Sequence, residues 1–109
     1  MPVSVNRMEA DESFDGRGLE LRIGGELRLS LKENPTTGFR WVADSLADTV
    51  CRLDGDDFEN VPTARGSGGT HRWHFHATRR GTGTLRFSYR RPWEQAAALR
   101  TFTLTIRVS

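Results

Sequence analysis

The sequence has very little cysteine, which excludes a disulfide framework. Its only cysteine is Cys51, between Val50 and Arg52, so no disulfide can form within the chain. A nucleophilic cysteine needs an activating histidine and an accessible, electropositive setting, and the residues around Cys51 show no such pattern. We therefore expect Cys51 to be a small buried hydrophobic residue and the fold to be held by packing alone.

Long apolar runs are also absent. No stretch approaches the roughly 18 apolar residues that a membrane span requires, and the composition of 36% hydrophobic and 28% charged residues is that of a soluble globular protein. Residues 1–18 lack the apolar segment of a signal peptide. The sequence thus predicts no membrane partner and, for the chain as given, a cytoplasmic location; a periplasmic or secreted location is the alternative if a leader was removed.

Lysine is nearly missing, since 15 of the 16 basic residues are arginine, and these are spread along the whole chain. Nucleic-acid-binding proteins usually gather basic residues on one face with aromatic residues between them, and only the stretch 90–93 approaches this pattern. Together with the small net charge of +2, this predicts a solvated surface and no nucleic-acid partner.

Helical spacing of apolar residues is almost absent, and a period of two dominates instead. Alternating segments separated by turn residues predict about seven strands, near 19–23, 27–31, 39–43, 49–53, 72–78, 85–90 and 101–108. We expect the first two to form a hairpin or a pair of neighbouring strands across Gly24 and Gly25, and the strands at 72–78 and 85–90 to pair as an antiparallel hairpin.

Seven short strands with one apolar face each, in about 100 residues, favour an all-β immunoglobulin-like sandwich of two antiparallel sheets. The disulfide and tryptophan hallmark of true immunoglobulin domains is missing, so only the architecture is predicted. Residues 1–17 have few apolar residues and are expected to form a mobile tail before a single domain at 18–109. The predicted inward-facing residues are Trp41, Trp73, Phe75, Leu85, Phe87, Phe102, Leu104 and Ile106.

A first segment that folding alone does not explain is the hexapeptide at 34–39, which reads Asn34, Pro35, Thr36, Thr37, Gly38 and Phe39. Pro35 fixes its own φ and restricts Asn34, and Gly38 can take positive φ to bring the chain into the next strand. The pattern predicts a stiff projecting loop with two threonines at its tip.

A second segment is the glycine-rich run from Arg65 to Thr70, which contains Gly66, Ser67, Gly68 and Gly69. Such a run is often a flexible tip. Glycines also let a backbone approach another surface closely and expose its N–H and C=O groups for pairing. A phosphate-binding loop is excluded because no Gly-Lys-Ser/Thr follows.

The third segment, residues 89–94, contains Arg91, Pro92 and Trp93. A tryptophan after a proline, flanked by charged residues, is typical of an exposed loop, and exposed Trp and Arg dominate binding hot spots. In a sandwich, the loops after alternate strands emerge at the same end. The three segments are therefore expected to form one contiguous binding edge.

The motifs NPTTGF, GSGG and RPW, in this order and at these spacings, resemble those of the chagasin family of cysteine protease inhibitors. The resemblance extends over about 19–108 and implies a reversible, competitive inhibitor of papain-family enzymes. We also expect a monomer when free, with no metal or cofactor. It implies that the 34–39 loop enters the catalytic centre with Thr36 and Thr37 over the active cysteine. Residues 66–69 would pair through their backbone on the non-primed side of the cleft, and residues 91–93 would pack on the primed side.

Other functions are weaker interpretations of the same residues. The acidic residues show no catalytic motif, so an enzyme is not expected. His74 and His76 share a strand face while His71 has the opposite parity, so solvent-facing residues explain the three histidines better than a metal site does. A non-catalytic adhesion or carbohydrate-binding sandwich would account for Trp93 but not for the other two motifs.

Overall fold

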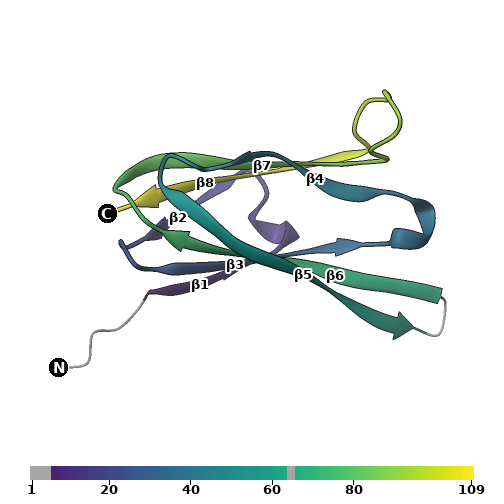
Figure 1. The fold of residues 1–109 in the computed structure, drawn as a ribbon, viewed down its shortest axis with the longest axis horizontal. Helices are drawn as coiled ribbons and strands as arrows, with labels where there is room; N and C mark the ends of the chain where they lie inside the picture. Colours follow the sequence, from purple (N-terminus) through teal and green to yellow (C-terminus); the bar gives the residue numbers. More distant parts are fainter. Residues whose placement is uncertain (1–5, 64–65) are drawn as a thin grey trace.

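The computed structural model describes residues 6–63 and 66–109, and these fold into two stacked four-stranded sheets (Figure 1). One sheet has the strand order β1-β3-β6-β5 and the other β2-β8-β7-β4. The strands are β1 (Arg7–Ala10), β2 (Arg17–Leu21), β3 (Glu26–Glu33), β4 (Arg40–Leu46), β5 (Cys51–Thr63), β6 (Gly66–Ala77), β7 (Gly81–Arg90) and β8 (Arg100–Val108). Two 3-10 helices are short: η1 (Glu12–Phe14) and η2 (Pro35–Thr37).

The core lies between the two sheets and consists of the alternate residues that the sequence predicts. All eight predicted inward-facing side chains are at most 6% exposed. Trp73 of one sheet packs against Phe87 of the other, with ring centroids 4.7 Å apart. Cys51 is buried with them, and burial raises the pKa of its thiol to about 11, which suits an unreactive packing residue.

Both predicted hairpins are wrong, because each turn carries the chain from one sheet to the other. Strand β2 lies in the sheet opposite to β3, and β6 in the sheet opposite to β7. Instead, β3 pairs with β6, and β7 pairs with β4 and β8. Strands in either layer point their apolar residues at the shared core, so alternation is the same whether a turn closes a hairpin or crosses the sandwich.

The sheets are mixed rather than purely antiparallel, since β1 runs parallel to β3 and β2 runs parallel to β8. Strand β1 and η1 belong to the stretch 1–17 that we expected to be a mobile tail. From residue 7 onward that expectation is wrong: Ala10 is buried, and Met8 and Phe14 pack against the core. Met8 and Ala10 give β1 an apolar face at alternate positions, and Phe14 of η1 extends that contact with the core.

Strand β5 is much longer than the strand expected near 49–53. It pairs with β6 as far as Thr63 and Gly66, and the two form a long hairpin. The run 54–60 is mostly acidic and lacks alternation, so it gave no strand signal; cross-strand pairs such as Arg72 to Glu59, 2.6 Å apart, support it instead. Among the described residues, no helix has the length and apolar character to cross a membrane.

Candidate functional site

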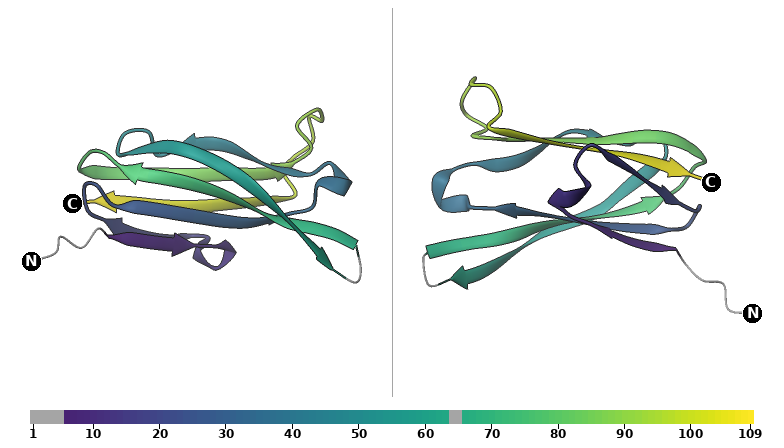
Figure 2. Two further views of the ribbon diagram at one scale, coloured as in Figure 1. Left: turned by 60° about the horizontal axis from the view of Figure 1, so that its bottom comes forward. Right: turned by 180° about the vertical axis from the view of Figure 1, so that it is seen from behind.

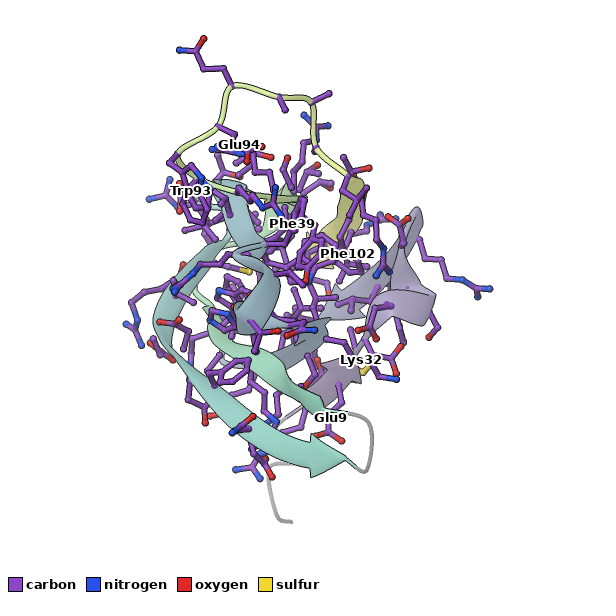
Figure 3. All side chains as sticks on the ribbon, turned by 90° about the vertical axis from the view of Figure 1, so that its right-hand side faces the viewer. Glu9, Lys32, Phe39, Trp93, Glu94 and Phe102 are labelled. Atoms are coloured by element: carbon purple, nitrogen blue, oxygen red, sulfur yellow. The ribbon has the colours of Figure 1, made fainter. Side chains whose placement is uncertain are left out.

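The three segments singled out in the sequence lie at the same end of the sandwich. The β3–β4 connection with η2, the β5–β6 hairpin beyond β3 and the β7–β8 connection lie at this end in each view (Figures 1 and 2). We call this the loop end; the C-terminus lies at the opposite end. Figure 3 looks onto the loop end and shows Phe39, Trp93 and Glu94 on one side of it.

The wedge loop, which we define as residues 34–39, is tied by its own hydrogen bonds. The Oδ1 atom of Asn34 accepts from the backbone N–H and the hydroxyl of Thr36 at 3.1 and 2.6 Å, and the hydroxyl of Thr37 donates to the Asn34 carbonyl at 2.8 Å. Gly38 has a φ of 78°, as predicted. The sequence interpretation credited Pro35 and Gly38 with the stiffness and missed Asn34, although an Asn just before a turn is a known turn-forming signal.

The third segment is joined to the wedge loop. The Nε atom of Arg91 donates to the carbonyl of Thr37 at 3.0 Å, and its guanidinium lies 4.5 Å from the centre of the Phe39 ring. Phe39 in turn stacks on Tyr89, 5.5 Å between centroids. Arg91 and Phe39 were predicted to contact a partner, and the structure gives both a supporting role within the loop end.

Trp93 is 69% exposed, as expected for a residue outside the core. Its ring lies over Gly38 so closely that a Cβ atom at position 38 would stand 2.5 Å from Trp93 Cη2. Gly38 is therefore required twice, by its positive φ and by the tryptophan packed on it. Between them, Gly38 and Trp93 present a continuous surface made from two loops.

The glycine-rich segment is not a loop, because Gly66–Gly69 form the first residues of β6. Arg65 lies outside the described residues. Pairing between β3 and β6 ends at Glu33 and Gly69, so residues 66–68 of β6 extend beyond the end of β3. In the register that the structure describes, these residues pair with β5. Their outer backbone edge is thus open at the loop end, the arrangement that strand addition requires.

The glycines of this segment differ in their surroundings. A Cβ on Gly69 would lie 2.3 Å from the Phe58 ring and 2.4 Å from the Glu59 carbonyl, whereas a Cβ on Gly68 would meet nothing within 4 Å. Gly69 is needed for the hairpin, and Gly68 is not. A hollow of about 460 Å³ separates the segment from the base of the wedge loop, and its lining includes Asn34 and Tyr89.

Beneath the wedge loop lies a group of ionisable residues that sequence reasoning missed. Glu33 is 6% exposed and is the one buried charged side chain among the described residues. Its Oε2 atom accepts from the Trp41 N–H at 3.1 Å and faces His71 Nδ1 at 3.1 Å. Burial opposes ionisation of Glu33, but these hydrogen bonds outweigh it and hold its pKa below the usual value.

The prediction that all three histidines face solvent is wrong for His71. Its ring stacks on Trp73 at 3.9 Å, with the inward parity of that strand, whereas His74 and His76 lie near Asp57 and Asp54 on the outer face. Within residues 6–63 and 66–109, no group of His, Cys, Asp or Glu is arranged to hold a metal ion. The loop end therefore offers hydroxyls, an open strand edge and an indole ring, which suit binding to another protein.

Two curated relatives match this chain over most of its length. Amoebiasin-1 of Entamoeba histolytica is 32% identical over 101 residues, which are 93% of this chain and 99% of that protein. Chagasin of Trypanosoma cruzi is 30% identical over 89 residues, which are 75% of this chain and 79% of that protein.

Two solved structures show the same fold. A cysteine protease inhibitor from Entamoeba histolytica has a TM-score of 0.89 at 22% identity and covers 99% of this chain and 100% of its own. The protein PbICP-C, solved in complex with falcipain-2, has a TM-score of 0.66 at 16% identity and covers 100% of this chain and 95% of its own. These neighbours confirm the predicted immunoglobulin-like sandwich.

The family comparison agrees with the motifs at the loop end. The model of the chagasin family peptidase inhibitors, I42, matches residues 20–106, which include all three segments. The description of the family is that of peptidase inhibitors, a non-catalytic role, in agreement with the prediction that the chain is not an enzyme. The chain therefore belongs to the chagasin family of peptidase inhibitors.

Proposed function

We propose that this chagasin-family cysteine protease inhibitor binds papain-family enzymes reversibly and competitively, with its loop end seated in the catalytic cleft. The wedge loop enters the catalytic centre, where Thr36 and Thr37 cover the active cysteine. Residues 66–69 pair through their open backbone edge on the non-primed side, and Arg91, Pro92 and Trp93 pack on the primed side. The observation that carries the proposal is the internally bonded wedge loop, flanked at one end of the molecule by the other two segments.

The wedge loop is suited to inhibition because it is both rigid and folded. Its turn is set before binding, so little conformational entropy is lost when the enzyme closes on it. Peptides recognised by strand addition lie extended, whereas residues 35–37 form one turn of 3-10 helix. A loop held in that turn fills the cleft without presenting an extended peptide for cleavage.

The relatives support the choice of target. One neighbour of the same fold is named a cysteine protease inhibitor, and another was solved with falcipain-2, a papain-family protease. An adhesion or carbohydrate-binding role, the alternative from the sequence, is supported by exposed Trp93 alone. The wedge loop and the open edge of β6 favour the protease.

The test is a titration of papain with the protein while hydrolysis of a fluorogenic peptide is followed at several substrate concentrations. A competitive inhibitor raises KM and leaves kcat unchanged. In the Thr37→Arg variant, added bulk and charge at the tip of the wedge loop should abolish most inhibition. The matched control is Thr82→Arg, an exposed threonine at the start of β7, far from the loop end.

Both variants should keep an unfolding midpoint close to that of the parent, because both threonine side chains are exposed and Thr37→Arg removes only exposed hydrogen bonds within the loop. If Thr37→Arg inhibits as strongly as the parent, the wedge loop does not enter the cleft. If the parent itself fails to inhibit, the alternative of a non-catalytic binding module replaces the proposal.

A further inference from the structure

A single carboxylate bridges the two strands from which the wedge loop projects. Glu33 is the last residue of β3, and its Oε2 atom accepts the backbone N–H of Trp41, the second residue of β4. The indole N–H of Trp41 donates back to the Lys32 carbonyl at 2.8 Å. The separation of the two ends of the loop, and so the direction in which its tip points, depends on where the Glu33 carboxylate is held.

His71 is the side chain that holds this carboxylate from the neighbouring strand. Its Nδ1 atom is 3.1 Å from Glu33 Oε2 on β3, and its Nε2 atom is 2.6 Å from Asp56 Oδ2 on β5. A neutral imidazole has one N–H and can donate to one partner only, whereas the imidazolium can donate to both. Two carboxylates, one at each ring nitrogen, are thus the partners of a protonated histidine.

We propose that His71 is a positioning residue for the wedge loop, and that its protonation couples the strength of inhibition to pH. This inference rests on the proposed function, since it concerns the loop that would enter the protease. In the protonated state, the imidazolium of His71 forms an ion pair with the Glu33 carboxylate and holds it in place to accept the Trp41 N–H. In the neutral state the bridge loses its cation, and the wedge loop is held less firmly.

The two carboxylates respond differently when His71 loses its proton. The Asp56 side chain is 51% exposed and can turn to water, whereas the Glu33 side chain is 6% exposed and cannot. The remaining N–H therefore stays with Glu33 and donates a hydrogen bond without a positive charge on the ring. The bond still reaches a charged carboxylate, and what is lost is the attraction between the imidazolium and Glu33, so we expect inhibition to weaken by about fivefold and not to be abolished.

Other charged and titratable groups face the same hollow or act on Glu33. Besides Asp56 from β5, they are Lys32 from β3, Arg40 from β4, Tyr89 from β7 and Arg100 from β8. Lys32, Arg40 and Arg100 are exposed cations, and none contacts Oε2 in place of His71. Of these cations, Arg40 favours the charged form of Glu33. The arginine does not lose its charge in this pH range, so the pH response of the bridge comes from His71.

The direction of the pH effect on inhibition follows from the pKa shifts of His71 and Glu33. Burial opposes protonation of His71, but the hydrogen bonds to Glu33 and Asp56 outweigh it and raise the pKa above 6.5. The cation is therefore fully present below pH 6.5 and is lost as pH rises through the raised pKa. Because the pKa of Glu33 lies below 4.5, both partners are charged from pH 4.5 to 6.5. Inhibition should be strongest in that window and weaken above it.

The first experiment uses the parent protein alone. NMR spectra between pH 4.5 and 8.5 report the titration of the His71 ring and the backbone amides of Thr36, Gly38 and Trp41. We expect these amides to shift with the midpoint of His71, which lies above 6.5. Amides that stay constant through the His71 titration would overturn the proposal without reference to any protease.

The second experiment separates the effect of the clamp, which we define as the contact of His71 with the Glu33 carboxylate, from the pH dependence of the enzyme. The inhibition constant of His71→Gln against papain is divided by that of the parent at each pH, so the titration of papain cancels. Glutamine donates a neutral hydrogen bond at every pH, and the ratio should fall from about five at pH 5.5 to about one above the pKa of His71. His74→Gln, whose histidine is on the outer face near Asp57, should give a ratio of one throughout.

The outcomes distinguish this inference from the proposed function. A flat ratio for His71→Gln, with an inhibitory parent, overturns the role of His71 and leaves the protease function intact. A parent that fails to inhibit papain at pH 5.5, while the loop amides still titrate with His71, keeps the clamp and overturns the proposed function.

Discussion

At the scale of single residues, the loop end contains two kinds of side chain, those that face outward and those that hold the others in place. Trp93, Thr36 and Thr37 are exposed and available to a partner. Arg91 donates hydrogen bonds to the Thr37 carbonyl and to the Glu94 carboxylate. The tryptophan is therefore the residue from which we expect binding energy, and the arginine the one that orders the surface beneath it.

Replacing Trp93 by Ala should weaken inhibition of papain by about 1–3 kcal/mol, roughly ten- to a hundredfold. Tryptophans that become buried against a partner are frequent binding hot spots. The unfolding midpoint should hardly change, since the ring is 69% exposed in the free protein. Ile23→Ala, which removes a half-exposed apolar residue at the other end of the sandwich, is the control. An equal loss of stability in Trp93→Ala would place the ring in the fold and not in the interface.

A Gly38→Ala variant tests the junction of two loops. Alanine at a φ of 78° is expected to cost about 1–2 kcal/mol of folding free energy, and its Cβ would displace the Trp93 ring. Inhibition should fall as the surface shared by the two loops is disrupted.

The matched control for Gly38→Ala is Gly24→Ala, which has a similar φ of 85° and nothing within 4 Å of the added Cβ. Chemical denaturation and the inhibition constant are measured for both. The control should lose similar stability and keep full inhibition; a parallel loss of inhibition would contradict the local explanation.

At the scale of elements, the β5–β6 hairpin carries the glycine segment beyond the sandwich. Residues 66–68 pass the end of β3, and their outer edge is open because β3 stops at Glu33. Such an edge normally invites unwanted pairing, and natural proteins cover or shorten it. An open edge beside the wedge loop is consistent with a strand that is paired when the protease binds.

A pair of glycine variants separates folding from binding in this hairpin. Gly68→Ala should keep the parent's stability, because its Cβ has free space, and should weaken inhibition if a protease strand approaches that backbone. Gly69→Ala should lower the free energy of unfolding by about 1–3 kcal/mol, because its Cβ overlaps Phe58 and the Glu59 carbonyl.

Gly55→Ala, in the same hairpin but with open space around the added Cβ, is the control and should leave both quantities unchanged. Thermal unfolding and papain inhibition are measured for the three variants. If Gly68→Ala inhibits like the parent, the segment does not bring its backbone against the enzyme.

At the scale of the whole molecule, the sandwich is a scaffold whose core and binding end are separate. The core residues come from both sheets, and the largest side chains that are fully buried are Phe75, Phe87 and Phe102. The loop end is held by its own bonds among residues 33–41 and 89–94. Stability and inhibition should therefore be separable by mutation.

Replacing Leu104 by Ala should reduce the free energy of unfolding by about 2–5 kcal/mol, the usual cost of removing a fully buried leucine. Leu104 is 0% exposed and lies in the middle of β8, away from the loop end. Below the unfolding midpoint the inhibition constant should equal that of the parent. A loss of stability under about 0.5 kcal/mol would show that the inward face of β8 was misassigned.

Most of the fold class was predictable from alternation, as Trp41, Trp73 and Phe87 show, but the pairing of strands was not. The glycine turns at Gly24 and Gly81 predicted hairpins, whereas in the structure each turn connects strands of opposite sheets. Alternation reports which face of a strand meets the core and carries no information on which layer the strand joins. Likewise, the three motifs predicted that their segments lie at one end of the sandwich, whereas Glu33 and His71 gave no signal because charged residues on strands usually face water.

The sequence by itself determined the inward faces of the strands, the turn at residues 34–39 and the motifs that identify the family. These depend on neighbours along the chain, through backbone conformation, period-two alternation and the order of short motifs. Only the tertiary structure decided that Trp93 rests on Gly38, that Arg91 bonds to Thr37, and that a glutamate and a histidine 38 residues apart meet beneath the wedge loop. Such contacts arise from the register between strands and from the meeting of loops, which packing of the whole chain sets and local sequence does not.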